Sequence, residues 1–413
     1  MTSGAIPLSA RVKRIKPSPS MVARQRAQAL KAEGRDIVDL TIGEPDFDTP
    51  LHIQQATTAA MAAGETRYTP VNGTLRLRKA ICAKLARENG VSYAPDEITV
   101  GSGAKQVIYN ALAATLGDGD EVIVPAPYWV SYPDMVLACD GTPVIVACGE
   151  NAGFKLTAAA LDAAITPRTR WLILNTPSNP TGAFYSAAEM QALTDVLLRH
   201  PHVALMTDDI YEHIRFDGGA PVCPVALAPE LRARTLLVNG VSKTYAMTGF
   251  RIGYGAGPKP LLAAMHVIQS QTTSGAAAMC MAGAAAALEG DQSLVATFRD
   301  AYRARRDRAV TMLNSIDGLT CRPPDGAFYV YPGCAGLIGR RRADGRVLAS
   351  DTDVAMYFLE DAGVAVLDGT AYGLSPYLRL SIATSLDVIE EACRRLAQAC
   401  SALHPSPTTE DHP

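Results

Sequence analysis

The sequence predicts an α/β protein in which a mostly parallel sheet is covered by helices on both faces. From about Ile98 to Gly257, short apolar runs alternate with amphipathic segments. Strands that alternate with helices are typical of parallel sheets with two covered faces. The chain has 413 residues, 48% of them hydrophobic, which is enough for a large core and two or three structural units.

The expected strands are short apolar runs that end at loops. They cover residues 121–124, 144–146, 171–174, 203–206, 236–238 and 252–254. Ligands of parallel sheets bind beyond the carboxyl ends of the strands. We therefore expect the functional residues in the loops that follow these runs.

The second half of the chain predicts a smaller domain. The sequence pattern over residues 259–313 is mostly helical, and we expect one long helix there to link the two domains. Further on, the apolar runs 326–330, 363–367 and 377–382 predict a small sheet with flanking helices.

Composition narrows the class of protein. A formal net charge of −3 argues against nucleic acid as a partner, because binding to a phosphate backbone calls for a basic face. The nine cysteines form no C-x-x-C pair and the seven histidines show no metal-ligand spacing, so we expect free thiols, a reducing compartment and no metal.

No segment predicts contact with a membrane. The apolar run from Ala276 to Leu288 is too short to span a bilayer, and the N-terminus lacks the apolar core of a secretory signal. We expect a cytoplasmic protein.

Lys243 is the residue whose setting points most directly to chemistry. The run 236–238 reads as a buried strand, Asn239-Gly240 as a sharp turn, and Lys243 as part of the loop that follows. A lysine among apolar and hydroxyl groups can have a lowered pKa, which suits an amine that condenses with an aldehyde. Arg251, between two glycines, could bind a phosphate nearby. Together they suggest pyridoxal phosphate, whereas the alternative is an ordinary surface Lys-Arg pair beside a turn.

Three other loops contain candidate residues. Gly103-Ala104-Lys105 precedes the helical run 106–116, whose free N–H groups could bind a phosphate, although the spacing is not that of a Walker loop. Asn179 lies in an Asn-Pro-Thr-Gly turn after the run 171–174. Asp208 follows the run 203–206, where a carboxylate could keep a pyridinium nitrogen protonated.

Arg379 lies inside an apolar strand pattern, in Leu378-Arg379-Leu380-Ser381. A buried arginine needs an anionic partner. Either it pairs with an internal acid, or it binds a substrate carboxylate through a bidentate fork.

Two motifs carry a resemblance to a known family. The pattern S-K-T-x-x-x-T-G-x-R-x-G-Y, from Ser242 to Tyr254, and the N-P-T-G turn that begins at Asn179 resemble the class I aminotransferases of PLP fold type I. The resemblance covers roughly residues 7–396 and is strongest with the bacterial aspartate aminotransferase branch, some members of which also transaminate prephenate.

The resemblance implies a fold and its domains. It implies a seven-stranded type of mostly parallel sheet between helices in a large PLP-binding domain, and a small α+β domain. The expected boundaries are an N-terminal arm over 1–45 that joins the small domain, the large domain over 46–290, the small domain over 291–400, and a disordered tail over 401–413.

The resemblance also implies roles for the cofactor site. Lys243 binds the aldehyde of pyridoxal phosphate and transfers protons, Asp208 pairs with the ring nitrogen, and Tyr211 and Asn179 bind the phenolic oxygen. The other cofactor contacts are Gly103, Ala104, Lys105, Trp129, Ser242, Arg251 and, from the neighbouring subunit, Tyr68. Because Tyr68 acts across subunits, the resemblance implies a homodimer with shared active sites.

For the substrates, an amino acid and a 2-oxo acid, the resemblance implies a further set of contacts. Gly43 and Arg379 bind the α-carboxylate, and Trp129 and Asn179 lie beside the substrate. Lys16 and Lys105 are the two candidates for a distal carboxylate. The expected reaction is amino transfer from aspartate or glutamate to 2-oxoglutarate or oxaloacetate, with prephenate as a further acceptor.

Several alternatives stay open at this point. The same cofactor chemistry serves lyases and decarboxylases of fold type I, and aminotransferases of neutral or aromatic amino acids. A PLP-binding transcription regulator would need a DNA-binding module, for which only about 45 residues precede the large domain. A dehydrogenase would rest on the run from Gly253 to Gly257, which is not G-x-G-x-x-G.

Overall fold

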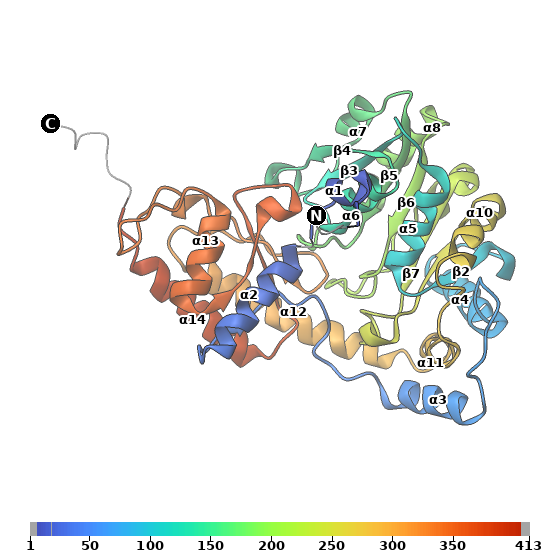
Figure 1. The fold of residues 1–413 in the computed structure, drawn as a ribbon, viewed down its shortest axis with the longest axis horizontal. Helices are drawn as coiled ribbons and strands as arrows, with labels where there is room; N and C mark the ends of the chain where they lie inside the picture. Colours follow the sequence, from blue (N-terminus) through green and yellow to red (C-terminus); the bar gives the residue numbers. More distant parts are fainter. Residues whose placement is uncertain (1–5, 18, 406–413) are drawn as a thin grey trace, which may run out of the picture.

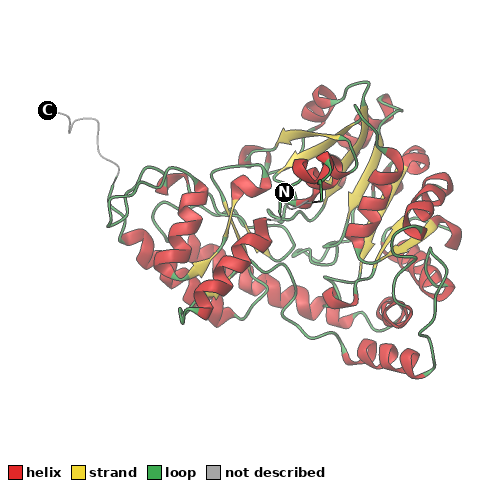
Figure 2. Cartoon of the chain, viewed as in Figure 1, coloured by secondary structure: helices red, strands yellow, loops and turns green. Residues whose placement is uncertain are grey.

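The computed structural model describes residues 6–17 and 19–405, and its centre is a seven-stranded sheet (Figures 1 and 2). In spatial order the strands are β2 (Ile98–Gly101), β8 (Gly253–Ala256), β7 (Thr235–Gly240), β6 (Ala204–Asp208), β5 (Thr169–Asn175), β3 (Glu121–Ala126) and β4 (Thr142–Ala147). Strand β8 is antiparallel to both of its neighbours, and the other pairs are parallel. The predicted mostly parallel sheet is confirmed, with β2 as a strand that the apolar runs did not indicate.

Alternating side chains of the sheet fill two different cores. In β3, Val122 and Val124 are buried on one face and Ile123 on the other. In β5, Trp171 and Ile173 share the face of Val122. This period of two is the pattern expected of a strand that is covered on both sides.

Helices cover both faces of the sheet. The helices against Val122 and Val124 are α5 (Ala104–Thr115), α6 (Ser131–Ala138) and α10 (Lys259–Ser270). The opposite face is covered by α4 (Leu75–Glu88), α7 (Ala158–Ala164), α8 (Ala187–Arg199), α9 (Pro224–Leu227) and α11 (Ala278–Glu289), with α3 (Leu51–Ala62) packed on α11. The apolar run from Ala276 to Leu288 is thus a packed helix.

The small domain lies beside the sheet and has its own core (Figure 1). Its elements are α12 (Ser293–Leu313), β9 (Tyr329–Val330), α13 (Asp351–Tyr357), β10 (Val364–Ala365), β11 (Leu367–Asp368), β12 (Leu378–Ser381) and α14 (Leu386–Ser401). The predicted long linking helix is α12, which has 21 residues. Strands β11, β12 and β9 form the small antiparallel sheet.

The N-terminal arm divides between the two domains, whereas the sequence predicted that it joins the small one. Helix α2 (Pro19–Ala32) and strand β1 (Val38–Asp39) lie on the small domain, where β1 pairs with β10. Helix α1 (Ala10–Arg14) instead packs on α6 of the large domain (Figure 1), and Arg11 forms an ion pair of 2.7 Å with Asp140. In the second half of the arm, Leu30 and Ile37 are buried against Leu359 of the small domain, whereas α1 has no buried residue.

The first residues of the predicted C-terminal tail belong to the folded small domain. Ser401 ends α14, Leu403 is buried, and the backbone of His404 pairs with Arg341. The remaining residues of the predicted tail, 406–413, lie outside the described part of the chain.

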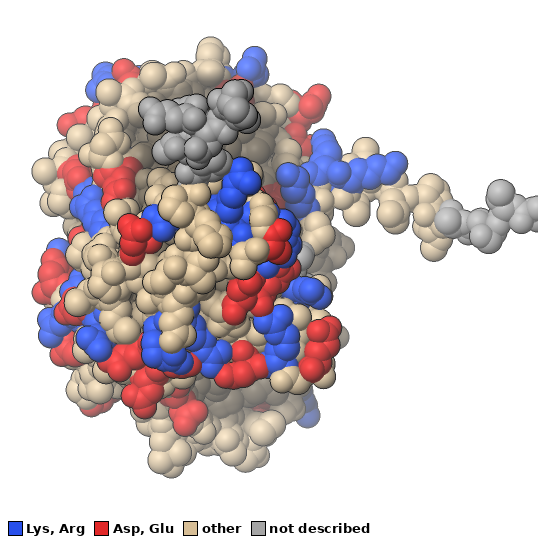
Figure 3. Space-filling model, turned by 90° about the vertical axis from the view of Figure 1, so that its left-hand side faces the viewer, with Lys and Arg blue, Asp and Glu red and all other residues tan. Residues whose placement is uncertain are grey.

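Charges of both signs are mixed on the face of the small domain that Figure 3 presents. No helix within the described residues is long and apolar enough to cross a membrane.

Candidate active site

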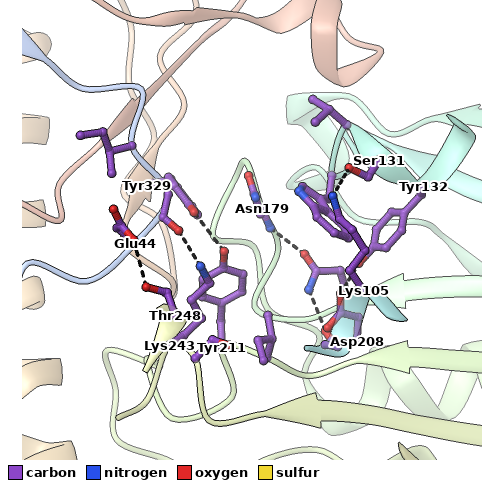
Figure 4. A pocket seen from close by; sticks show the side chains of 18 of the residues that line it. Glu44, Lys105, Ser131, Tyr132, Asn179, Asp208, Tyr211, Lys243, Thr248 and Tyr329 are labelled. Carbon is purple, nitrogen blue, oxygen red and sulfur yellow. Dashed lines mark hydrogen bonds between the residues drawn. The ribbon is translucent and has the colours of Figure 1, made fainter. Parts of the chain in front are cut away.

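A pocket of about 410 Å³ lies where the two domains meet, beyond the carboxyl ends of β5, β6 and β7 (Figure 4). Asn175 and Asp208 are the last residues of β5 and β6, and Ser242 and Lys243 follow β7 directly. The arm contributes residues 41–44, α5 contributes its first turn, and the small domain contributes Tyr329 and Arg379. This is the edge of the sheet at which the sequence predicted the functional residues.

The amine of Lys243 points into this pocket. Its Nζ donates a hydrogen bond of 2.5 Å to the backbone carbonyl of Gly43. Burial lowers the pKa of Lys243 to about 8, an effect that the nearby carboxylate of Glu44 opposes. Thr248 holds that carboxylate through a hydrogen bond of 2.9 Å. A lysine in this setting is partly neutral near physiological pH and can act as a nucleophile or a base.

Asp208 is a buried carboxylate with one free oxygen. It is 4% exposed, and the hydroxyl of Tyr132 donates to its Oδ2 at 2.6 Å. Its Oδ1 has no hydrogen-bond partner among the described residues. Burial raises the pKa of Asp208 to about 6, although the bond from Tyr132 works against that shift. A buried, unsatisfied oxygen is unfavourable unless a ligand donates to it, so the site fits a cationic N–H group.

A cradle for an anion lies at the start of α5. Gly103 has φ of 88°, and a Cβ atom there would lie 2.4 Å from a guanidinium nitrogen of Arg251. Ala104 and Lys105 are the first residues of the helix, where backbone N–H groups have no intrahelical partner. The free N–H groups, the helix dipole and the arginine fit a phosphate. Ser242 lines the same pocket and is nearly buried.

Lys105 and Trp129 form one wall of the pocket. The Lys105 ammonium lies 4.6 Å above the Trp129 ring and donates to the hydroxyl of Ser131 at 3.0 Å. Burial lowers the pKa of Lys105, and the neighbouring charge of Arg251 lowers it further. Neither partner of Lys105 is an anion, so its charge is available to a ligand.

Arg379 is buried and has no acidic partner among the described residues. It is 3% exposed, its Nη2 donates to the carbonyl of Thr41 at 2.6 Å, and its Nη1 donates to Oδ1 of Asn179 at 3.3 Å. Its Nε has no hydrogen-bond partner among the described residues. The sequence left two explanations for this arginine, and the geometry favours the one in which it binds a carboxylate ligand.

Tyr211 and Tyr329 meet on the floor of the pocket, where their hydroxyl oxygens lie 3.0 Å apart. Burial raises the pKa of Tyr211 well above its usual range, and the neighbouring Tyr329 adds to the shift. Tyr329 and Tyr132 line the pocket but were not among the predicted residues. Tyr329 lies in the predicted apolar run 326–330, where only the fold shows that its hydroxyl faces Tyr211.

Two predicted residues do not lie in this pocket. Lys16 is exposed, and its contact is a backbone N–H bond of 3.2 Å to Asp134. Tyr68 is 99% exposed, as a residue that acts in a neighbouring subunit would be in a single chain. The remaining predicted residues line the pocket or border it, with Gly103 adjoining Arg251.

The groups in this pocket match the functional groups of pyridoxal phosphate. The lysine amine suits the aldehyde, the free oxygen of Asp208 suits the pyridinium N–H, and the cradle at α5 suits the phosphate. Trp129 offers an aromatic face for the ring.

Comparison with known proteins agrees with this reading. The family described as "Aminotransferase class I and II" matches residues 35–396. An aspartate aminotransferase of Rhizobium meliloti is 53% identical over 96% of this chain and 96% of its own length. An aspartate/prephenate aminotransferase of Cereibacter sphaeroides is also 53% identical, over 96% of this chain and 99% of its own.

Solved structures show the same likeness. The crystal structure of the aspartate aminotransferase from Rhizobium meliloti has a TM-score of 0.95 and 52% identity, and covers 97% of this chain and 100% of that one. The aspartate aminotransferase of Thermus thermophilus with maleate has a TM-score of 0.89 and 39% identity, and covers 96% and 100% of the two chains. Family profile, relatives and structures agree along nearly the whole length, so the chain belongs to the class I and II aminotransferases, in the branch of the bacterial aspartate and aspartate/prephenate enzymes.

Proposed function

We propose that this aminotransferase uses pyridoxal phosphate to transfer the amino group of aspartate or glutamate to a 2-oxo acid in a ping-pong cycle. The observation that carries the proposal is the pairing of Lys243 and Asp208 in one pocket, with the amine inside it and one carboxylate oxygen left free.

When bound, pyridoxal phosphate supplies an aldehyde and an electron-withdrawing ring. Asp208 keeps the ring nitrogen protonated, because its charge can reach that atom through the free Oδ1. Lys243 takes a proton from the substrate Cα and later returns it on the product side, and its lowered pKa suits both directions.

The other pocket residues hold and orient the cofactor. Gly103, Ser242, Arg251 and the backbone N–H groups of Ala104 and Lys105 would hold the phosphate, which leaves the ammonium of Lys105 for another anion. Trp129 would offer its aromatic face to the ring, and Tyr211 and Asn179 would supply polar groups for the phenolic oxygen. In the structure the Tyr211 hydroxyl bonds to that of Tyr329, and Asn179 accepts a bond from Arg379. The residues proposed for the phenolic oxygen are therefore bonded to other residues of the pocket, among them the arginine proposed for the substrate carboxylate.

The charges around the pocket favour a dicarboxylic substrate. Arg379 and Gly43 bind the α-carboxylate, and the free Nε of Arg379 supports this role. Lys105 then remains for the distal carboxylate, since it lines the pocket and has no anionic partner in the part of the chain that the structure describes. Lys16 is the weaker candidate because it lies outside the pocket in this chain. The Thermus relative solved with maleate, a dicarboxylate, agrees with the assignment, and prephenate would suit the same charges.

We propose a homodimer with shared sites in the cytoplasm. Tyr68 is fully exposed, and Leu51, Met61, Leu75 and Val267 are exposed apolar residues on helices of the large domain. A second subunit would cover such residues and receive Tyr68 near its phosphate cradle. The cysteines are all free thiols, which supports a reducing compartment.

The Lys243→Ala variant tests this function. We expect the purified wild-type protein to have visible absorption from the bound cofactor and the variant to lose both that band and turnover. Lys79→Ala, which removes an exposed lysine from α4, is the control and should behave as wild type. Normal turnover by Lys243→Ala would show that the nucleophile is assigned wrongly.

A further inference from the structure

A second cluster of buried charges lies behind the pocket, between α4 and the two loops that hold Asp208 and Lys243. Lys84 of α4 is 0% exposed, and its ammonium bonds to the carboxylate of Glu212 and to Oδ1 of Asn89, the latter at 2.7 Å. Glu212 also accepts from Asn89 at 2.9 Å and from Asn239 at 2.6 Å. This lysine therefore has partners for its charge on several sides.

His213 extends the cluster to the loop of Lys243. One ring nitrogen lies 2.8 Å from the carboxylate of Glu88, and the other lies 3.1 Å from the hydroxyl of Thr244. Burial would raise the pKa of Glu88, but the bond from His213 and the charge of Lys84 outweigh it and lower that pKa to about 2. Both nitrogens of His213 are thus used, one on α4 and one beside Lys243.

The cluster has the ligand types of a metal site, since atoms of Glu88, Glu212 and His213 lie within 4.8 Å of one another. However, the ammonium of Lys84 already lies between the two carboxylates, at 3.5 Å from Glu88 and in contact with Glu212. A metal ion there would meet a like charge in a buried space. The cluster is complete without a ligand.

The contacts of this cluster join the segments that carry Asp208 and Lys243. One bound cofactor must reach both of these residues, so the distance between them has to be fixed. Asp208 is the last residue of β6, and Glu212 and His213 lie in the loop that follows it. Lys243 belongs to the same loop as Thr244, which follows β7, the strand of Asn239. Asn239 donates to Glu212, and His213 meets the hydroxyl of Thr244, so these bonds link the loop after β6 to β7 and to the loop that follows β7. Helix α4 bonds to the loop after β6 through Lys84 and Glu88.

We propose that Lys84, Glu212, His213 and Thr244 are positioning residues that set the Lys243 amine relative to the Asp208 carboxylate. This inference rests on the proposed function, in which one cofactor must reach both groups. Arg379, which binds the substrate carboxylate, lies on the small domain and does not contact the cluster. Loss of the cluster should therefore lower kcat and weaken cofactor binding, and leave KM for the amino acid nearly unchanged.

Thr244→Val is the decisive variant, because it keeps the branched shape and removes the hydroxyl that meets His213. Its control is Thr235→Val, at the start of β7, where a buried hydroxyl donates to the carbonyl of Leu231 at 2.9 Å. Thr244→Ser keeps the hydroxyl and should therefore retain both kcat and cofactor binding. A double variant with His213→Leu tests whether the two residues act as one.

We expect Thr244→Val to lower kcat with aspartate by about 10- to 100-fold, since a small misplacement of a reacting group has effects of this size. Binding of pyridoxal phosphate to the cofactor-free variant, followed by visible absorption, should weaken as well. Adding His213→Leu should lower kcat little further. Thr235→Val should lower the melting temperature by about as much as Thr244→Val does. It should change neither kcat nor the affinity for pyridoxal phosphate.

The inference is wrong if Thr244→Val and Thr235→Val have equal kcat and cofactor affinity, because the cluster would then only stabilise the fold. It is also wrong if Thr244→Ser fails to retain kcat and cofactor binding or if the two substitutions are additive. These outcomes are separate from failure of the proposed function, which would appear as turnover by Lys243→Ala.

Discussion

Buried charges occupy two neighbouring regions of this molecule, and they differ in whether their hydrogen bonds are complete. Behind the pocket, Lys84 and Glu212 have several polar partners each. In the pocket, Asp208 and Arg379 are just as buried but have a free Oδ1 and a free Nε among the described contacts. Both regions are desolvated, so the difference lies in pairing.

Folded proteins rarely leave buried polar atoms unsatisfied, and each exception needs an explanation. The cluster at Lys84 has complete hydrogen bonds, so its structural role in joining the segments after β6 and β7 is sufficient to account for it. The incomplete pair at Asp208 and Arg379 is explained when a ligand supplies a donor to the first and a carboxylate to the second. Of these two regions, the ligand site is therefore distinguished by the incomplete pairing of Asp208 and Arg379 and not by the number of its buried charges.

Substitution of Asp208 gives the largest expected effect. Asp208→Ala removes the charge that keeps the ring nitrogen protonated, and we expect kcat to decrease by several orders of magnitude, more than the cofactor affinity changes. The free energy of unfolding of the cofactor-free variant should change little, because the removed carboxylate was incompletely paired. Full activity at full cofactor occupancy would transfer the role to another residue such as Asp209.

Substitution of Lys84 should lower the stability of the fold as well as kcat. Lys84→Met leaves Glu212 buried without its cation, and we expect the free energy of unfolding to decrease by about 3–5 kcal/mol in urea titration of the cofactor-free protein. Lys79→Met, on the exposed side of the same helix, should stay within about 0.5 kcal/mol of wild type. Equal stability of the two variants would contradict the view that the cluster is a complete ionic network.

Substitution of Lys105 should change selectivity. An unpaired cation in the pocket disfavours apolar side chains by about 1–3 kcal/mol, so Lys105→Met should reduce the preference for aspartate over alanine by about 10- to 100-fold in kcat/KM. Lys16→Met is the comparison, and we expect it to change the ratio less. If Lys16→Met has the larger effect, the distal carboxylate lies nearer the arm, and if neither variant matters, the dicarboxylate assignment fails.

The pH dependence of cofactor binding gives a smaller effect. Burial lowers the pKa of Lys243 from 10.5 to about 8, so the neutral, nucleophilic fraction increases as pH rises and saturates above pH 8. The rate at which the cofactor-free protein binds pyridoxal phosphate should follow this curve. Glu44 raises the pKa of Lys243, so Glu44→Gln should shift the midpoint to lower pH. A rate that still increases near pH 10 would mean an ordinary lysine.

The sequence predicted the fold and most of the pocket because the residues involved follow strands. Lys243, Asp208 and Asn179 come just after apolar runs, and such ends meet at one edge of a parallel sheet. Their roles came from the resemblance, since a single loop such as N-P-T-G also fits plain turn chemistry.

Other features depend on contacts that no local pattern encodes. The buried position of Lys84 is one, because its helix also carries exposed charges and only packing decides which is covered. Tyr132 reaches Asp208 from α6, which is distant in sequence. The docking of α1 on the large domain depends on the pairing of Arg11 with Asp140. Each is a tertiary pairing between separate segments.

A single-turnover reaction with aspartate tests the central claim most directly. Purified, cofactor-loaded protein is mixed with excess aspartate and no 2-oxo acid, and oxaloacetate and ammonia are measured. An aminotransferase forms one oxaloacetate per active site, releases no ammonia, and resumes turnover when 2-oxoglutarate is added. Continued release of ammonia or of a decarboxylated product without any acceptor would contradict the account and favour a lyase or a decarboxylase.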